Sequence, residues 1–146
     1  MPSRALIIEA RFYDDIADML LAGASAELKR RGFGVEVVTV PGALEIPPAL
    51  AIALASSRRR EKPFDLFVAL GCVIRGETSH YDTVAGESCR GLMDLAVGHR
   101  LALGNGILTV ENREQAVVRA DPAQKDKGGD AAAAAVALFE LRNALK

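Results

Sequence analysis

The sequence predicts a three-layer α/β fold in which helices cover both faces of a four-stranded parallel sheet. Short, unbroken apolar runs such as residues 66–70 are typical of strands that are buried on both sides. These runs alternate along the chain with longer segments whose apolar residues recur every three or four positions, as they do in helices. Such alternation favours parallel strands joined by right-handed crossovers.

The bounds of each element follow from apolar spacing and from residues that start or stop helices. Asp14 or Asp15 suits the N-cap of the first helix, Gly32 supplies its C-terminal stop, and Asp130 suits the cap of the last helix. The expected strands cover residues 5–8, 35–40, 66–70 and 106–110. The expected helices run from 14 or 15 to 32, from 47 to 57, from 81 to 99, from 111 to 119 and from 130 to 146.

Length and charge limit the classes of function. The chain has 146 residues, half of them hydrophobic, which suits one domain spanning 1–146. Its 18 basic and 19 acidic side chains give a net charge of −1, and therefore no overall attraction to nucleic acid or to an anionic membrane. The basic connector 58–63 is expected to be a solvated loop rather than a nucleic-acid contact, because no aromatic residues interleave with its charges. Apolar runs are far shorter than the roughly 20 residues of a membrane-spanning helix.

Cysteine and histidine usage points to a soluble cytoplasmic protein without a metal centre. Cys72 and Cys89 form neither a CxxC pair nor a disulfide framework, and no charged and then apolar leader opens the chain. His80 and His99 are widely separated, and no cysteine cluster supplies the other ligands that zinc needs. Serine-hydrolase chemistry is disfavoured because residues 86–91 miss the G-x-S-x-G spacing and fall within an expected helix.

Ligands of parallel α/β sheets bind at the carboxyl ends of the strands. Four loops follow strands in this chain and are therefore expected at that edge: residues 10–14, 41–47, 71–80 and 111–113.

The segment 71–80 is the richest of these loops in polar chemistry. Its glycines and hydroxyls lie where a buried strand passes into a helix, so free backbone amides there would form a pocket for phosphate or another anion. The same residues also suit a simple helix-capping turn that uses Thr78 or Ser79, and the sequence alone leaves both interpretations open. His80 lies at the helix entry, and we interpret it as a general acid and base rather than as a structural histidine.

Four residues elsewhere in the chain are candidates for contacts with a ligand. Glu45 would accept hydrogen bonds from sugar hydroxyls, or else only complement a helix dipole. Phe12 follows a buried strand and would either stack on a planar ring or belong to the core. Arg119 could bind phosphate through two parallel hydrogen bonds from its guanidinium. For both Arg119 and Lys127, the alternative is a solvated side chain at the surface.

Several segments together resemble the lumazine synthase family, whose members catalyse the penultimate step of riboflavin synthesis. The match spans nearly the whole chain in the right order, and its two long motifs are specific. The segments that carry it are Arg11-Phe12, Val40-Pro41-Gly42-Ala43-Leu44-Glu45-Ile46-Pro47, 69–82, 106–112, Gln115-Ala116, Arg119-Ala120 and Lys127-Gly128.

The resemblance implies a flavodoxin-like sheet and active sites built between the subunits of a homopentamer. It also implies a cofactor-independent transferase with two small-molecule substrates, 5-amino-6-(ribitylamino)uracil and 3,4-dihydroxy-2-butanone 4-phosphate. Their condensation gives 6,7-dimethyl-8-ribityllumazine, phosphate and water.

Matched position by position, the resemblance implies His80 as the catalytic proton carrier. Phe12 would stack on the pyrimidine, 43–45 would hold the ribityl chain, and the backbone of 73–74 would contact the ring edge. Residues 76–78 would cradle phosphate together with Arg119 of a neighbouring subunit. The implied substrate-binding set is Phe12, Ala43, Leu44, Glu45, Val73, Ile74, Gly76, Glu77, Thr78, Asn105, Arg119 and Lys127.

The chain departs from the family pattern at three positions that affect substrate affinity. Tyr13 stands where Asn is common, Leu44 where Phe is common, and Asn105 where an aromatic often covers the substrate from the next subunit. The loop 121–127 lacks the glycine-bearing kink of shell-forming members, so a pentamer or a pair of pentamers is expected. A non-catalytic flavin- or lumazine-binding paralogue is the rival class, and the retained His80, Arg119 and Lys127 argue against it.

Overall fold

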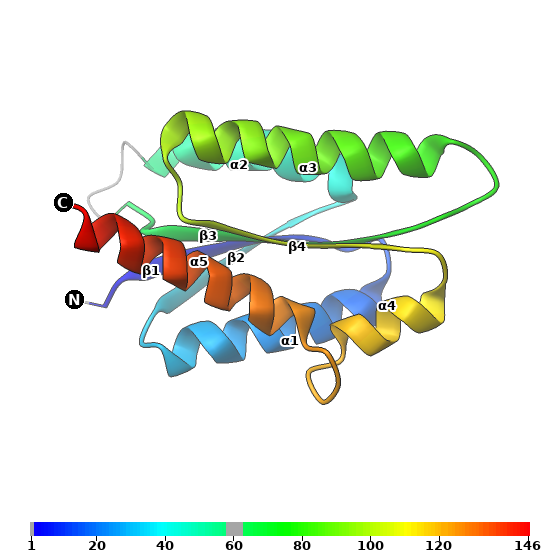
Figure 1. The fold of residues 1–146 in the computed structure, drawn as a ribbon, viewed down its shortest axis with the longest axis horizontal. Coiled ribbons are helices and arrows are strands. Elements are labelled where there is room, and N and C mark those ends of the chain that lie inside the picture. Colours follow the sequence, from blue (N-terminus) through cyan, green and yellow to red (C-terminus); the bar gives the residue numbers. More distant parts are fainter. Residues whose placement is uncertain (1, 58–62) are drawn as a thin grey trace.

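The computed structural model describes residues 2–57 and 63–146 and shows a parallel sheet between two layers of helices (Figure 1). The basic connector 58–63 lies outside the described residues except for Pro63. In the sheet order β2-β1-β3-β4, the strands are β1 (Arg4–Ala10), β2 (Gly34–Val40), β3 (Leu66–Ile74) and β4 (Leu103–Val110). All three strand pairs are parallel, so the predicted four-stranded sheet is confirmed.

The helices divide between the two faces of the sheet, as Figure 1 shows. One face is covered by α2 (Ile46–Ser57), which a 3₁₀ turn η1 (Ala43–Glu45) precedes, and by α3 (His80–His99). The other face is covered by α1 (Asp14–Arg30), α4 (Arg113–Ala120) and α5 (Lys127–Ala144). None of these helices, within the part of the chain that is described, has the length and apolar character required to cross a membrane.

Each face of the sheet has its own hydrophobic core. Alternate residues of β1 point to opposite sides, so that Ile7 packs with α1 and α5 whereas Leu6 and Ile8 pack with α2 and α3. The run from 66 to 71 in β3 is buried at every position because helices cover both of its sides.

The neighbouring strands β1 and β3 send their connections to opposite faces. The chain leaves β1 for α1, which lies on one face, and leaves β3 for α3, which lies on the other (Figure 1). The two loops therefore diverge at the carboxyl edge of the sheet and leave a crevice between them, the position at which open α/β sheets bind ligands.

The third strand is longer than the apolar run 66–70 predicts. The segment 71–74, predicted as loop, is strand, because β4 pairs with it from Gly71–Ile107 to Ile74–Val110. Pairing with β1 stops earlier, at Glu9–Leu70. On the β1 side, no described strand therefore pairs with the backbone of the last four residues of β3.

The N-caps of the first and last helices differ from the prediction. Tyr13 occupies the cap position of α1 and makes no side-chain cap hydrogen bond, while Asp14 is already helical.

The last helix begins at Lys127 rather than Asp130, and Asp126 caps it by accepting a hydrogen bond from the backbone N–H of Gly129 at 3.2 Å. Gly128 belongs to this first turn because any side chain there would overlap the backbone of α1 at Leu20. The stop at Gly32, whose φ is +88°, is confirmed.

Gly104→Ala is expected to destabilise the protein by about 3 kcal/mol, because the added methyl group would overlap the backbone carbonyl of Ala131 in α5. Gly98→Ala is the matched control, since a methyl group at that position of α3 has no heavy atom within 4 Å. Urea unfolding of both variants measures the difference. Equal midpoints would contradict the close approach of β4 and α5.

Candidate active site

A cavity of about 420 Å³ opens in the crevice between the β1–α1 and β3–α3 connections. Its volume lies within the range of roughly 300–1,000 Å³ that is usual for small-molecule sites. Three of the four loops predicted from the topology contribute to it, whereas no residue of the fourth, 111–113, lines the cavity. The lining residues are Phe12, Tyr13, Pro41, Gly42, Ala43, Leu44, Glu45, Cys72, Val73, Ile74, Gly76, Thr78, His80, Tyr81 and Val84.

Two aromatic residues of the β1–α1 connection form one wall of the cavity. Phe12 is 71% exposed, so the alternative that it belongs to the core is wrong. Its ring meets that of Tyr13 edge-on, with 4.9 Å between the ring centroids. Burial raises the pKa of the Tyr13 phenol, which therefore remains protonated at neutral pH and can donate a hydrogen bond. The face of Phe12 is available to stack on a flat ring.

The β2–α2 connection supplies backbone groups and one carboxylate. Ala43 is buried and anchors the turn η1, while Leu44 and Glu45 line the cavity. The N–H of Glu45 donates to the carbonyl oxygen of Gly42 at 3.1 Å. A side chain on Gly42 would meet Oε1 of Glu45 at 3.2 Å, so glycine at this position leaves room for the carboxylate. The Glu45 side chain is exposed and suited to accept hydrogen bonds from hydroxyl groups.

The β3–α3 connection brings together backbone, hydroxyl and imidazole groups. Gly76 has open space around it, and Thr78 and His80 line the same cavity. Oγ1 of Thr78 accepts a hydrogen bond from the backbone N–H of His80 at 3.3 Å, whereas Ser79 makes no side-chain cap contact. Thr78 thus helps to cap the helix and also faces the cavity, so the two interpretations of this segment are compatible. The start of α3 is an environment that favours an anion.

Arg75, which the sequence interpretation missed, closes the base of this connection. Its guanidinium lies 4.2 Å from the ring centroid of Tyr81, and its Nε donates to Glu111 at 2.8 Å. Its backbone N–H donates to the carbonyl oxygen of Val110 at 2.9 Å. The sequence could have indicated this contact, because Arg75 and Glu111 each follow one of two adjacent strands, β3 and β4, and therefore lie near each other.

Other lining residues were missed for reasons of local geometry. Tyr81 and Val84 follow His80 by one and four positions, so helical spacing places Val84 on the same side of α3 as His80. Cys72 reaches the cavity only because β3 continues beyond Leu70.

Four of the predicted site residues do not line the cavity: Glu77, Asn105, Arg119 and Lys127. Nη1 of Arg119 donates to the carbonyl oxygen of Gln115 in its own helix at 3.1 Å. Nζ of Lys127 lies 3.4 Å from Asp130, and Nδ2 of Asn105 lies 3.5 Å from Sγ of Cys89. A single chain therefore brings together the Phe12 ring, the 43–45 turn and the His80 imidazole, but not the cations of Arg119 and Lys127.

The described residues form no metal-binding cluster, and the thiol at this site, that of Cys72, is not reactive. Across residues 2–57 and 63–146, no group of three or more His, Cys, Asp or Glu side chains is arranged to hold a metal ion. Burial raises the pKa of the Cys72 thiol to about 12, because an apolar environment disfavours the thiolate. Cys72 is therefore a neutral wall of the cavity at physiological pH and not a nucleophile.

Cys72 is expected to react with iodoacetamide about 1,000-fold more slowly than an unperturbed thiol at pH 8, since only the thiolate reacts. Because the pKa is raised to about 12, the rate should keep rising tenfold per pH unit through pH 10 without a plateau. The Cys89→Ser variant isolates the Cys72 signal, and peptide mass spectrometry measures it. A plateau near pH 9 would contradict the buried, neutral thiol.

Comparison with known proteins identifies the family of the chain. Residues 2–143 match the model of the family described as 6,7-dimethyl-8-ribityllumazine synthase. A protein of that name from Novosphingobium aromaticivorans is 61% identical over 140 residues, which cover 96% of each chain. One from Methylorubrum populi is 58% identical over 142 residues, covering 97% of this chain and 84% of the relative. One from Rhodopseudomonas palustris (strain BisA53) is 56% identical over 143 residues, covering 98% of this chain and 88% of the relative.

The family match covers all the connections that line the cavity, and these relatives are similar over nearly the entire chain. The chain belongs to the 6,7-dimethyl-8-ribityllumazine synthase family.

Proposed function

We propose that the chain is a cofactor-independent transferase of riboflavin biosynthesis. It condenses 5-amino-6-(ribitylamino)uracil with 3,4-dihydroxy-2-butanone 4-phosphate, giving 6,7-dimethyl-8-ribityllumazine, phosphate and water. The observation that carries this proposal is that Phe12, Glu45, Thr78 and His80, from three separate connections, line one cavity. Family membership implies two small-molecule substrates and an assembly of several copies of the chain.

The pyrimidine substrate is proposed to lie against the β1 side of the cavity. Phe12 stacks on its ring, and the 43–45 turn holds its ribityl hydroxyls through backbone groups and the Glu45 carboxylate. The backbone of Val73 and Ile74 contacts the ring edge. Support comes from the strand register, because β1 pairing ends at Leu70 and leaves this side of Val73 and Ile74 without a paired strand in the described chain.

The phosphorylated ketone is proposed to lie at the start of α3. Gly76, Glu77 and Thr78 surround its phosphate with backbone N–H groups and a hydroxyl, in a position that the helix dipole favours. Arg119 of a neighbouring copy supplies the guanidinium, and Lys127 of that copy approaches the pyrimidine. Neither side chain lines the cavity of its own chain, which supports this assignment.

His80 is proposed to carry protons through the reaction. The amine of the pyrimidine condenses with the ketone to give an imine and water, phosphate then leaves by elimination, and ring closure releases a second water. Each step transfers a proton, and imidazole both accepts and returns one near neutral pH. Holding both substrates in one cavity converts a bimolecular encounter into a positioned reaction, which we take as the main source of acceleration.

The proposed assembly is a homopentamer, alone or as a pair of pentamers, formed from one 1–146 domain per subunit. The surface supports association between copies, because large apolar side chains are exposed on α3 and α2. These side chains are Ile52, Met93 and Val97. The free thiols of Cys72 and Cys89 suit the reducing cytoplasm, where we place the reaction.

The purified protein is expected to form fluorescent lumazine from the two substrates faster than the spontaneous reaction does. Fluorescence recorded with and without protein measures the rate. Product formation at only the spontaneous rate would contradict the enzymatic proposal. Ligand binding without catalysis would then be the remaining function.

His80→Ala is expected to lower kcat by about 100-fold while the KM of each substrate changes little, since proton transfer is lost but the binding groups remain. His99→Ala, at the opposite end of α3, is the control and should retain wild-type kcat. Steady-state kinetics with either substrate in excess gives these constants. An unchanged kcat in His80→Ala would refute the assigned role.

Arg119→Ala is expected to raise the KM of the phosphorylated substrate by about tenfold or more, because a charge-assisted hydrogen bond to phosphate is removed. The KM of the pyrimidine should stay near its wild-type value. Arg113→Ala is the matched control, because Arg113 lies at the other end of α4 and pairs with Asp15. A KM for the phosphorylated substrate that Arg119→Ala leaves unaltered would contradict the phosphate contact.

A further inference from the structure

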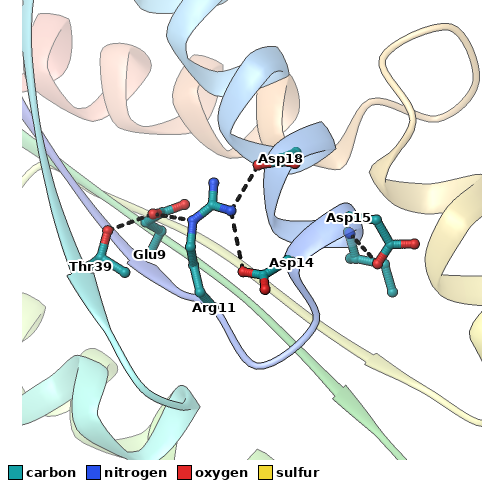
Figure 2. Close-up of polar contacts among 7 residues, drawn as sticks. Glu9, Arg11, Asp14, Asp15, Asp18 and Thr39 are labelled. Atoms are coloured by element: carbon teal, nitrogen blue, oxygen red, sulfur yellow. Dashed lines mark hydrogen bonds and ion pairs between the residues drawn. The ribbon is translucent and has the colours of Figure 1, made fainter.

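Glu9 is a buried carboxylate at the end of an otherwise apolar strand. It is 2% exposed and lies among the apolar residues of β1. Its Oε2 accepts hydrogen bonds from Nε of Arg11 at 2.8 Å and from Oγ1 of Thr39 at 2.6 Å, as Figure 2 shows. Its Oε1 is buried and accepts no hydrogen bond within the described residues. Arg11 and Thr39 are thus the side chains that orient this carboxylate.

Arg11 joins this carboxylate to the first turns of α1. Nη1 of Arg11 lies 2.8 Å from Oδ1 of Asp18 and 3.5 Å from Oδ1 of Asp14 (Figure 2). One planar side chain therefore contacts both the strand that enters the β1–α1 connection and the helix that leaves it. Only arginine combines this reach with separate donors that point to the two sides.

The residues on both sides of Phe12 are also held through their backbones. The N–H of Arg11 donates to the carbonyl oxygen of Val40 in β2 at 3.1 Å, and the carbonyl oxygen of Tyr13 accepts from Ala17 at 2.9 Å. Phe12 itself is 71% exposed, and its ring meets only the ring of Tyr13 among the aromatic contacts of the described chain. The direction of the Phe12 ring therefore depends on the backbone of the two residues that flank it. The side chain of Arg11 adds contacts to Glu9, Asp14 and Asp18 on either side of this segment.

Only the Glu9 carboxylate of this ion pair is fully buried, since the side chain of Arg11 is 26% exposed. Burying a carboxylate is a poor means of gaining stability, because its desolvation offsets much of the attraction to its partner. An apolar side chain at position 9 would match the rest of β1, yet a carboxylate is present two residues before the loop that reaches the cavity. A charge pair at this position has a strong directional requirement, which an apolar contact lacks. The ion pair is therefore better explained by the geometry it imposes on the loop.

We propose that Glu9 and Arg11 are positioning residues that hold Phe12 in its stacking orientation and thereby set the affinity for the pyrimidine substrate. This inference rests on the proposed function. It assigns to residues outside the cavity a specific effect on one of the two substrates.

A double-mutant cycle tests the proposal. Phe12→Ala should raise the KM of the pyrimidine about tenfold, as expected for loss of one stacking contact. Arg11→Ala should raise the same KM several-fold and change the KM of the phosphorylated ketone less than about twofold. The double variant should be no worse than Phe12→Ala alone, because Arg11 acts through the ring that is already missing. Arg11→Lys, which keeps the charge but not the two-sided geometry, should recover only part of the loss.

Two further variants carry the same chemical change, Glu to Gln. Glu9→Gln tests the proposal, and Glu27→Gln is its matched control. Glu9→Gln keeps the shape of the side chain and should raise the KM of the pyrimidine in the same direction even if Arg11→Ala folds poorly. Glu27→Gln breaks ion pairs with Arg30 and Arg31 at the far end of α1 and should leave both KM values unchanged.

The same cycle is measured by titrating 6,7-dimethyl-8-ribityllumazine and following its fluorescence, which requires no turnover. A wild-type protein that forms no product would refute the proposed function, but the affinity of each variant for the lumazine could still be measured. Additive effects of Arg11→Ala and Phe12→Ala on binding, or an equal rise in both KM values, would overturn the positioning role.

Discussion

The divergence of the chain after β1 and β3 is the constraint on which the candidate site depends. These strands pair side by side, but α1 and α3 lie on opposite faces of the sheet, so the two connections must separate at the carboxyl edge. The longer β3 deepens the crevice, because its last four residues extend past the end of β1 pairing. This topology places the β1–α1 connection, which carries Phe12 and Tyr13, on one side of the crevice and the start of α3 on the other.

The cavity is suited to two substrates with different chemistry. The wall near β1 offers a ring face and a carboxylate, which match a flat heterocycle with a hydroxylated chain. The wall near α3 offers amides, a hydroxyl and an imidazole, which match an anion and a moving proton. The cations that would complete the anion site lie elsewhere on the surface of the same protomer. A neighbouring copy is the source of positive charge that best fits this division.

Much of the fold and nine of the fifteen residues that line the cavity were predicted, because the relevant signals are local. Apolar spacing identified the four strands and five α-helices of the described chain, but not the 3₁₀ turn η1, and it placed the start of β4 at 106 instead of Leu103. The rule that ligands bind at the carboxyl edge selected the connections that carry Phe12, Glu45 and His80. The remaining features depend on contacts between distant segments. The extension of β3 requires its partner β4, and the early start of α5 requires the close approach of Gly128 to Leu20. The ion pair of Arg11 with Asp18 was not detectable, because it forms only when α1 packs beside β1.

The central claim is that each site is shared between two subunits, and complementation between subunits that each lack one of the two groups tests it most directly. His80→Ala and Arg119→Ala chains are co-expressed in equal amounts, and mixed assemblies are verified by native mass spectrometry. Random mixing restores an intact His80 and Arg119 pair at about one quarter of the interfaces of a ring. Activity well below the KM of the phosphorylated substrate should then rise to about one quarter of wild type. Mixed assemblies no more active than the average of the two separate variants would contradict a site built across the interface.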